Sequence, residues 1–191
     1  MNEKLIAETF KHIPTLETSR LCLRRMKPSD AEDVFDYASR PETSKYLLWY
    51  PHEDLSYTKK YLKYIDKRYS QGAFFDWAVV EKNSGKMIGT CGFSKIDVNH
   101  ERGEVGYVLN PDFHRKGYAP EAASAVLRFG FEVLGLHRIE VRFMIENTAS
   151  RKVAEKLGMS FEGEERESML VKGRYRTIGI SSILKNEFEK Q

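Results

Sequence analysis

The chain has 191 residues, of which 41% are hydrophobic and 31% charged, and this is the size and composition of one soluble α/β domain. No stretch approaches the roughly 18 apolar residues of a membrane-spanning helix. The 31 basic and 28 acidic residues leave a net charge of +3, which is too small to indicate the basic patch of a nucleic-acid-binding protein. We therefore expect a single domain over residues 1–191, with neither nucleic acid nor membrane as a partner.

The N-terminal residues 1–13 lack the charged start, apolar middle and small-residue cleavage site of a secretory signal. We expect a cytoplasmic protein in which these residues form a short helical extension. Cys22 and Cys91 show no paired-cysteine spacing, and His100, His114 and His137 show no metal-ligand spacing. The sequence therefore predicts no disulfide framework, no zinc site and no other metal, and both thiols are expected to be buried.

In the first half of the chain, hydrophobic periodicity predicts strands at residues 20–25, 74–81 and 87–98 and helices at residues 31–38 and 56–69. The strands at 74–81 and 87–98 are joined by the turn-forming residues 82–86, which favours an antiparallel hairpin. Trp77 lies inside the first of them and is expected in the core. A turn at residues 99–103 adds a third strand to this meander.

A strand, a basic turn and a helix follow one another between residues 104 and 134. The apolar strand 104–109 is stopped by Asn110 and Pro111, because proline has no N–H to donate to a neighbouring strand. Residues 114–119, HRKGYA, form a basic turn, and the apolar spacing beyond Pro120 predicts a helix. Unpaired amides at a helix start attract anions, so the turn is a candidate phosphate site; the alternative is a solvated loop.

The remaining elements complete the order βααβββαβαββ. Residues 138–145 alternate as a strand, Asn147 is a good cap for a helix that ends at Gly158, and two further strands, 160–165 and 175–185, flank a turn at 171–173. The last strand is expected at an exposed edge of the sheet, where it is either covered or pairs with a second copy. The sequence leaves both a monomer and a homodimer open.

This order and its motifs resemble the GCN5-related N-acetyltransferase (GNAT) superfamily, and within it the Rim-type enzymes that acetylate the N-terminal amines of ribosomal proteins. The resemblance covers nearly the whole chain. It rests on Thr18-Ser19-Arg20-Leu21, Leu23-Arg24, Glu104-Val105-Gly106-Tyr107, the turn 114–119 with Glu121-Ala122, Asn147-Thr148-Ala149-Ser150 and Glu155-Lys156-Leu157-Gly158-Met159. It implies an α/β (α+β) fold with a mixed, mostly antiparallel central sheet, helices on both faces, and acetyl-CoA as cosubstrate.

The superfamily's pyrophosphate loop has the pattern Q/R-x-x-G-x-G/A, and this chain has His114, Gly117 and Ala119 at the three defined places. The first place departs from the pattern. Because the phosphate ligands of such a loop are mainly backbone amides, the cradle remains possible. The resemblance therefore implies coenzyme A contacts from His114, Arg115, Lys116, Gly117, Tyr118 and Ala119.

The resemblance further implies direct transfer of acetyl to an amine without a covalent enzyme intermediate. An ammonium must lose a proton before it attacks, and Glu104 is the candidate base, with Glu101 as a possible relay. Glu104 could instead be a surface carboxylate paired with Arg102 or Arg138. A backbone N–H between Val108 and Asn110, with Leu109 the first choice, is the candidate donor to the oxyanion.

Two residues of the second capped helix complete the implied site. Asn147 should bind the pantetheine or acetyl region, and Ser150 occupies the place of a Rim-type serine that can protonate the departing thiolate. Asn147 could be a plain helix cap and Ser150 could bond locally to the backbone. The tyrosine acid of many relatives is replaced by Ala154, and the aspartate and tyrosine of many Rim-type last strands are replaced by Thr177 and Ser181.

The resemblance leaves more than one class of acceptor open. Trp49 and Tyr50 lie between the two early helices, where the superfamily builds one wall of the acceptor groove, although they could be ordinary core. The first hypothesis is a protein or peptide N-terminal amine. A small amine such as a polyamine, amino acid or antibiotic is the alternative, and a non-catalytic coenzyme A-binding or interaction module is the alternative from another class.

Overall fold

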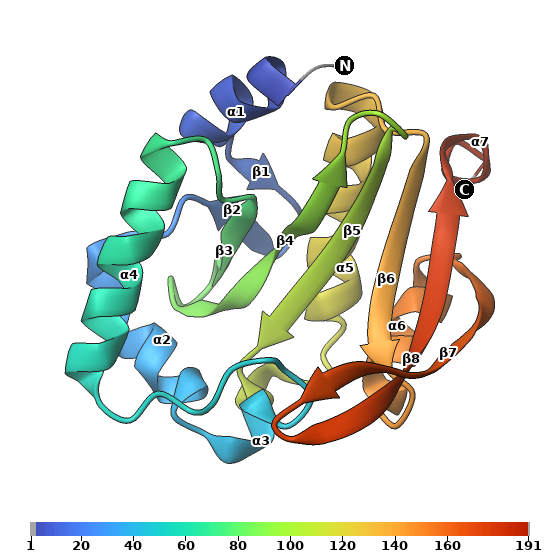
Figure 1. Ribbon diagram of the computed structural model, residues 1–191. Helices are drawn as coiled ribbons and strands as arrows, with labels where there is room; N and C mark the ends of the chain where they lie inside the picture. The colour runs from blue at the N-terminus through green and yellow to red at the C-terminus, as the bar shows by residue number, and fades with distance from the viewer. Residues whose placement is uncertain (1–2, 191) are drawn as a thin grey trace.

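The computed structural model describes residues 3–190, which contain one eight-stranded sheet in the order β1-β2-β3-β4-β5-β6-β8-β7 (Figure 1). The strands are β1 (Leu16–Glu17), β2 (Leu21–Arg24), β3 (Asp76–Glu81), β4 (Met87–Asp97), β5 (Arg102–Leu109), β6 (Arg138–Met144), β7 (Ser160–Val171) and β8 (Arg174–Leu184). Neighbouring strands are antiparallel except β5 and β6, which are parallel. The mixed, mostly antiparallel sheet confirms the expected fold class.

Helices lie on both faces of this sheet, as the sequence predicted. They are α1 (Glu3–Lys11), α2 (Ala31–Ala38), α3 (Pro41–Ser44), α4 (Leu55–Ser70), α5 (Tyr118–Arg128), α6 (Thr148–Lys156) and α7 (Lys185–Phe188). Figure 1 shows α2 and α4 on the face toward the viewer, and α5 and α6 behind it. The right-hand part of the front face, over β5, β6 and β8, is not covered by a helix. A π-helical turn, Phe129–Val133, continues α5.

The N-terminal extension is helical over α1, and residues 1–2 of that extension lie outside the described residues. Phe10 of α1 is fully buried and packs edge-on against Trp77 and Phe129. Trp77 is fully buried, which confirms its assignment to the core. Both cysteines are free thiols, but only Cys91 is fully buried, because Cys22 lies on β2 near the edge of the sheet.

The parallel strands β5 and β6 pair over only three residues and then separate. Their register ends at Glu104 and Glu140, although β5 continues to Leu109 and β6 to Met144. Beyond that point the inner edges of both strands face a gap rather than each other (Figure 1). A divergence of this kind leaves backbone N–H and C=O groups of β5 available to a ligand, because no neighbouring strand takes them.

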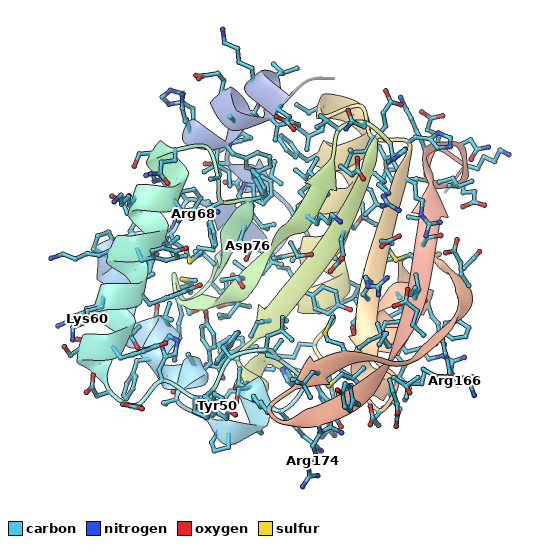
Figure 2. The ribbon with its side chains drawn as sticks, viewed as in Figure 1. Tyr50, Lys60, Arg68, Asp76, Arg166 and Arg174 are labelled. Atoms are coloured by element: carbon cyan, nitrogen blue, oxygen red, sulfur yellow. The ribbon has the colours of Figure 1, made fainter. Side chains whose placement is uncertain are left out.

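The β7–β8 hairpin is longer than predicted and crosses toward α3. Its turn at Lys172 places the ammonium of that residue 2.6 Å from the carbonyl oxygen of Ser44. Figure 2 shows Tyr50 near α3 and Arg174 at this end of the hairpin. The prediction that the last strand is an exposed edge is wrong: β8 pairs with β6 on one side and β7 on the other, and Ile183 is fully buried. The edge strand at this end of the sheet is β7.

Within residues 3–190, no helix combines the length and the hydropathy that crossing a membrane would require.

Candidate active site

A cavity of about 610 Å³ opens where β5 ends, beside the gap between β5 and β6. Four segments line it: α3 and its following loop, the end of β5, the turn into α5, and α6. Its lining residues are Glu42, Thr43, Tyr46, Leu47, Tyr107, Val108, Leu109, Pro111, Phe113, His114, Arg115, Gly117, Tyr118, Ala119, Pro120, Asn147, Ala149, Ser150, Lys152, Val153 and Lys156. The cavity therefore brings together most of the predicted cofactor residues, with Asn110 and Lys116 outside the lining.

The basic turn has the conformation of an anion cradle. Arg115 and Gly117 both have positive φ, 60° and 83°, and Gly117 is the residue that precedes α5. In the described part of the chain, no backbone carbonyl accepts a hydrogen bond from the amides of residues 115–117. Successive free amides at the start of an 11-residue helix form a concave site for phosphate oxygens.

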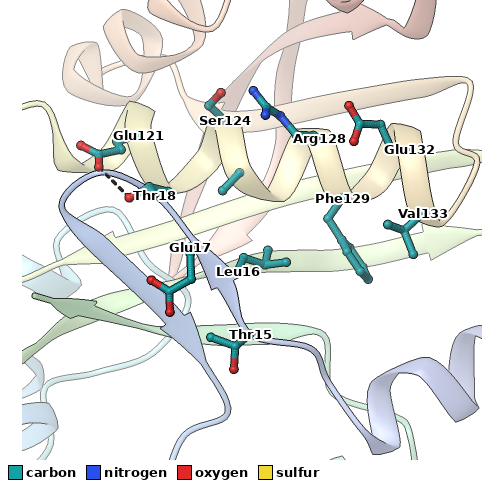
Figure 3. Close-up of a pocket in the computed structure, with 11 residues that line it drawn as sticks. Thr15, Leu16, Glu17, Thr18, Glu121, Ser124, Arg128, Phe129, Glu132 and Val133 are labelled. Atoms are coloured by element: carbon teal, nitrogen blue, oxygen red, sulfur yellow. Dashed lines mark hydrogen bonds between the residues drawn. The ribbon is translucent and has the colours of Figure 1, made fainter.

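Contacts from the first strand region hold this turn in place. The guanidinium of Arg20 donates to the carbonyl oxygen of Lys116 at 2.9 Å and stacks over the ring of Tyr118 at 4.5 Å. Glu121 of α5 in turn holds Arg20, accepting from its Nε at 2.7 Å and from Thr18 Oγ1 at 2.6 Å. Figure 3 shows the bond between Thr18 and Glu121 beside a second hollow, about 490 Å³, between β1 and α5.

His114, the residue that departs from the loop pattern, has a structural role. Its Nε2 lies 3.0 Å from the carbonyl oxygen of Leu109, and since a carbonyl only accepts, the ring donates. The turn is thereby tied to the end of β5. A histidine at this place helps to position the amides without needing to contact phosphate itself.

Leu109 presents its amide toward the gap beside β6. The next amide, that of Asn110, donates to the carbonyl of Ile88 on β4 at 2.7 Å. Peptide groups alternate in direction along a strand, so the N–H of Val108 also points to β4 and that of Leu109 points away. The Asn110 side chain is also engaged, donating to Asp36 at 2.9 Å. Of residues 108–110, Leu109 is therefore the one whose amide is not directed at β4 and could donate to an oxyanion.

Asn147 caps α6 as predicted, accepting from the amide of Ser150 at 3.2 Å. The hydroxyl of Ser150 lies 2.9 Å from the phenol oxygen of Tyr107, which also donates to the carbonyl of Ser150 at 3.1 Å. Burial raises the pKa of Tyr107, and the Ser150 hydrogen bond partly offsets that rise. Ala154 is fully buried and carries no acid. The sequence did not predict a role for the phenol of Tyr107, because no local pattern relates this residue to Ser150, which lies 43 residues later in the chain.

Three cationic side chains line the cavity: Arg115 from the turn, and Lys152 and Lys156 from α6. Both lysines were missed, although their spacing of four residues places them on one face of a helix whose start was predicted correctly. Together with the free amides, these charges fit the phosphates of coenzyme A. The apolar lining from Leu47, Val108 and Val153 suits its pantetheine arm.

Glu104 lies on the opposite face of the sheet from Tyr107, three residues earlier on β5. Its carboxylate accepts from the hydroxyl of Ser94 at 2.8 Å. The alternative pairings with Arg102 and Arg138 do not form, because Arg102 pairs with Asp97 and Arg138 with Glu140 and Glu162. Glu101 is exposed in the turn before β5. The catalytic role of Glu104 stays a prediction.

Trp49 and Tyr50 lie after α3 and outside the cavity lining. The Trp49 ring packs against that of His52 at 5.6 Å, while Tyr50 is 68% exposed with Lys172 of the hairpin 5.2 Å from its ring. Tyr50 thus borders the uncovered side of the sheet between α3 and the hairpin, whereas Trp49 is half-buried against the main core. Their contact with an acceptor stays a prediction.

Comparison with known proteins agrees with this geometry. Residues 20–160 match the family model described as an acetyltransferase (GNAT) domain. The N-acetyltransferase p20 of Bacillus licheniformis is 36% identical over 174 residues, which are 91% of this chain and 98% of p20. A GNAT-family acetyltransferase from Bacillus anthracis has a solved structure with a TM-score of 0.81 and 30% identity, covering 91% of this chain and 100% of that one.

Two more distant relatives have names that specify an acceptor. The [ribosomal protein uS5]-alanine N-acetyltransferase of Escherichia coli is 27% identical over 88% of this chain and 89% of its own length. The spermidine N(1)-acetyltransferase of the same organism is 27% identical over 87% of each chain. The relatives thus include enzymes named for protein and for small-amine acceptors.

Proposed function

The chain belongs to the GNAT family of acetyltransferases and is an acetyl-CoA-dependent N-acetyltransferase, and we propose that its acceptor is the N-terminal amine of a protein or peptide. The main support for a peptide acceptor is the sheet face over β5, β6 and β8, which no helix covers (Figure 1). An extended chain can lie across such a face and place its first residue at the gap between β5 and β6. A cytoplasmic location is part of this proposal.

The charges on the β6 and β7 part of this face are paired, which supports a peptide over a polycation there. Arg138 forms ion pairs with Glu140 at 3.0 Å and with Glu162 at 2.5 Å, and Arg142 pairs with Glu165. A site for a polyamine would present carboxylates without such partners. The exposed aromatic ring of Tyr50 supplies apolar contact for peptide side chains.

The cosubstrate supplies an acetyl group activated as a thioester. The free amides of residues 115–117 and the side chains of Lys152 and Lys156 would hold its phosphates, and Asn147 would bind near the pantetheine. The amide of Leu109, which points into the gap, would donate to the oxyanion that forms at the acetyl carbonyl. The backbone supplies this donor at a fixed position, so no side chain has to move.

Two side-chain groups would handle protons. Glu104, on the uncovered side of the sheet, would take a proton from the acceptor ammonium, directly or through water. Ser150, in contact with the phenol of Tyr107, would supply a proton to the departing thiolate. A thiolate is a good leaving group, so this second contribution is modest.

A small amine is the second candidate acceptor. The relative named for spermidine favours it, and so does one carboxyl group on the acceptor side that lacks a partner, Asp76, described below.

The test is acetyl-CoA consumption by the purified protein against N-terminal peptides and small amines, with the mass of each product measured. The proposal expects turnover with peptides, a mass gain at the N-terminus, and loss of most turnover in Glu104→Gln. Turnover confined to small amines would select the second candidate. Coenzyme A binding without turnover on any acceptor would favour the non-catalytic module.

A further inference from the structure

Asp76 opens β3 on the same side of the sheet as Glu104. Its cross-strand partner is Gly92 of β4, whose own partner is Gly106 of β5, and directly opposed residues share a face. Glu104 lies two residues before Gly106 and therefore on that face as well. Figure 2 shows Asp76 between α4 and the central strands.

The carboxyl group of Asp76 is half-buried and has no partner. Within residues 3–190, no side chain or amide donates a hydrogen bond to it and no cation pairs with it. Burial alone raises its pKa to about 7. The titratable groups on its side of the sheet are Tyr37 of α2 and Tyr61 and Tyr69 of α4, and Cys91 of β4 lies on the opposite face. All four are neutral at pH 7.

Other carboxylates on this side of the sheet are occupied. Glu104 accepts from Ser94, and the glutamates on β6 and β7 pair with Arg138 and Arg142. A half-buried carboxyl group without a donor costs folding free energy, and a cationic ligand at this place would compensate that cost. Aromatic walls beside a carboxylate suit an ammonium group on an aliphatic chain.

Glycines keep a path open between Asp76 and β5. A Cβ on Gly92 would lie 2.4 Å from Oδ1 of Asp76, so the carboxylate itself takes the place of a side chain there. A Cβ on Gly106 would meet nothing within 4 Å among the residues that the structure describes. Neighbouring strands are about 4.8 Å apart, so the carboxylate lies about one strand spacing from the open position over Gly106.

We propose that Asp76 binds a second, non-reacting ammonium group of the acceptor, which makes it a specificity-determining residue for acceptors that carry two cationic groups a short aliphatic chain apart. The reacting amine then lies over β5, near Glu104 and the gap, while the other ammonium lies between Gly92 and the tyrosines. The proposal rests on the transfer to an amine proposed above, but it holds for a small diamine and for a peptide with a cationic side chain beside its N-terminus.

The test compares putrescine with butylamine, which share a four-carbon chain and differ in one amino group. The kcat/KM of each is measured for the wild type, Asp76→Asn, and the control Asp66→Asn, which removes an exposed carboxylate of α4. We expect the wild type and Asp66→Asn to prefer putrescine by at least about tenfold, and Asp76→Asn to lose that preference while its kcat/KM for butylamine changes less than about twofold.

Binding measured without turnover separates this proposal from the proposed function. Calorimetry with putrescine in the presence of coenzyme A should show a Kd at least about tenfold weaker for Asp76→Asn than for the wild type, with coenzyme A affinity unchanged. A wild type that acetylates no amine yet shows this difference would count against the proposed function alone. Equal putrescine affinity in the two proteins, or an equal loss of kcat/KM for both amines in Asp76→Asn, would overturn the assignment.

Discussion

The hydroxyl oxygen of Ser150 lies 2.9 Å from the phenol oxygen of Tyr107, so a residue at the start of α6 and one near the end of β5 meet inside the cavity. This contact joins the two walls of the gap. It also supplies an O–H group from the first turn of α6, the helix in which Ala154 carries no acidic side chain.

The first prediction concerns these two hydroxyls. Ser150→Ala should lower kcat by about tenfold or less, below the usual range for general acids, because a thiolate leaves readily. Tyr107→Phe should lower kcat by less, since it removes the partner of Ser150 and leaves the serine in place. Steady-state kinetics with varied acetyl-CoA checks this. A loss of more than about a thousandfold in either variant would assign that residue a larger role than proton donation to a thiolate.

The second prediction concerns the support of the phosphate turn. Glu121→Gln should reduce the free energy of unfolding by about 1–3 kcal/mol, because it weakens the charged hydrogen bonds to Arg20 that fix the carbonyl of Lys116. The affinity of this variant for coenzyme A should fall as well. Urea unfolding and calorimetry measure the two effects, and Glu132→Gln, an exposed change on the same helical segment, is the control. Unchanged coenzyme A affinity would show that the turn does not depend on this support.

Local signals explain which parts of this site the sequence could predict. The stop at Pro111, the glycine-containing turn before α5 and the cap at Asn147 each depend on the chemistry of a few adjacent residues, and each lies where it was expected. The helix at residues 56–69 was likewise predicted to within one residue at each end, because its apolar stripe is long.

Contacts between distant segments explain what the sequence could not predict. The two-residue strand β1 and the four-residue helix α3 are too short to show a periodic pattern. The position of β8 between β6 and β7 depends on the order of pairing, which period-2 alternation does not encode. Asp76 was read as part of an ordinary strand, because its missing partner and the glycines beside it become visible only when β3, β4 and β5 are aligned.

The third prediction concerns the cationic wall of the cavity. Lys152→Ala should weaken coenzyme A binding by about threefold to tenfold at low salt, and the difference from the wild type should shrink as ionic strength rises, because exposed charges are screened. Calorimetric titration at two salt concentrations measures this. Lys63→Ala removes an exposed charge of α4 and should leave the affinity unchanged. A salt-independent loss in Lys152→Ala would indicate a packing effect instead of a charge effect.

The last prediction concerns the pH dependence of stability. The pKa of Asp76 is about 7 in the folded protein and 3.8 in an unfolded chain, so the folded state holds this proton more tightly. Between about pH 4 and pH 7 the carboxyl group is ionised in the unfolded state but still protonated in the folded state. The contribution of Asp76 to the free energy of unfolding therefore falls as pH rises from about 4 to 7 and stays low above pH 7. At about 1.4 kcal/mol per pKa unit, the total change amounts to a few kcal/mol.

Asp76→Asn cannot ionise and should lack this fall. Its melting temperature relative to the wild type should therefore be higher at pH 8 than at pH 5, whatever the two proteins' absolute stabilities, because every other titrating group is shared. Asp66→Asn, at an exposed position, should show no such change between the two pH values. Putrescine should raise the melting temperature of the wild type more at pH 8 than at pH 5, since a bound ammonium favours the ionised carboxylate. A constant difference between Asp76→Asn and the wild type across this range would mean that the carboxyl group is hydrated and already ionised at pH 5.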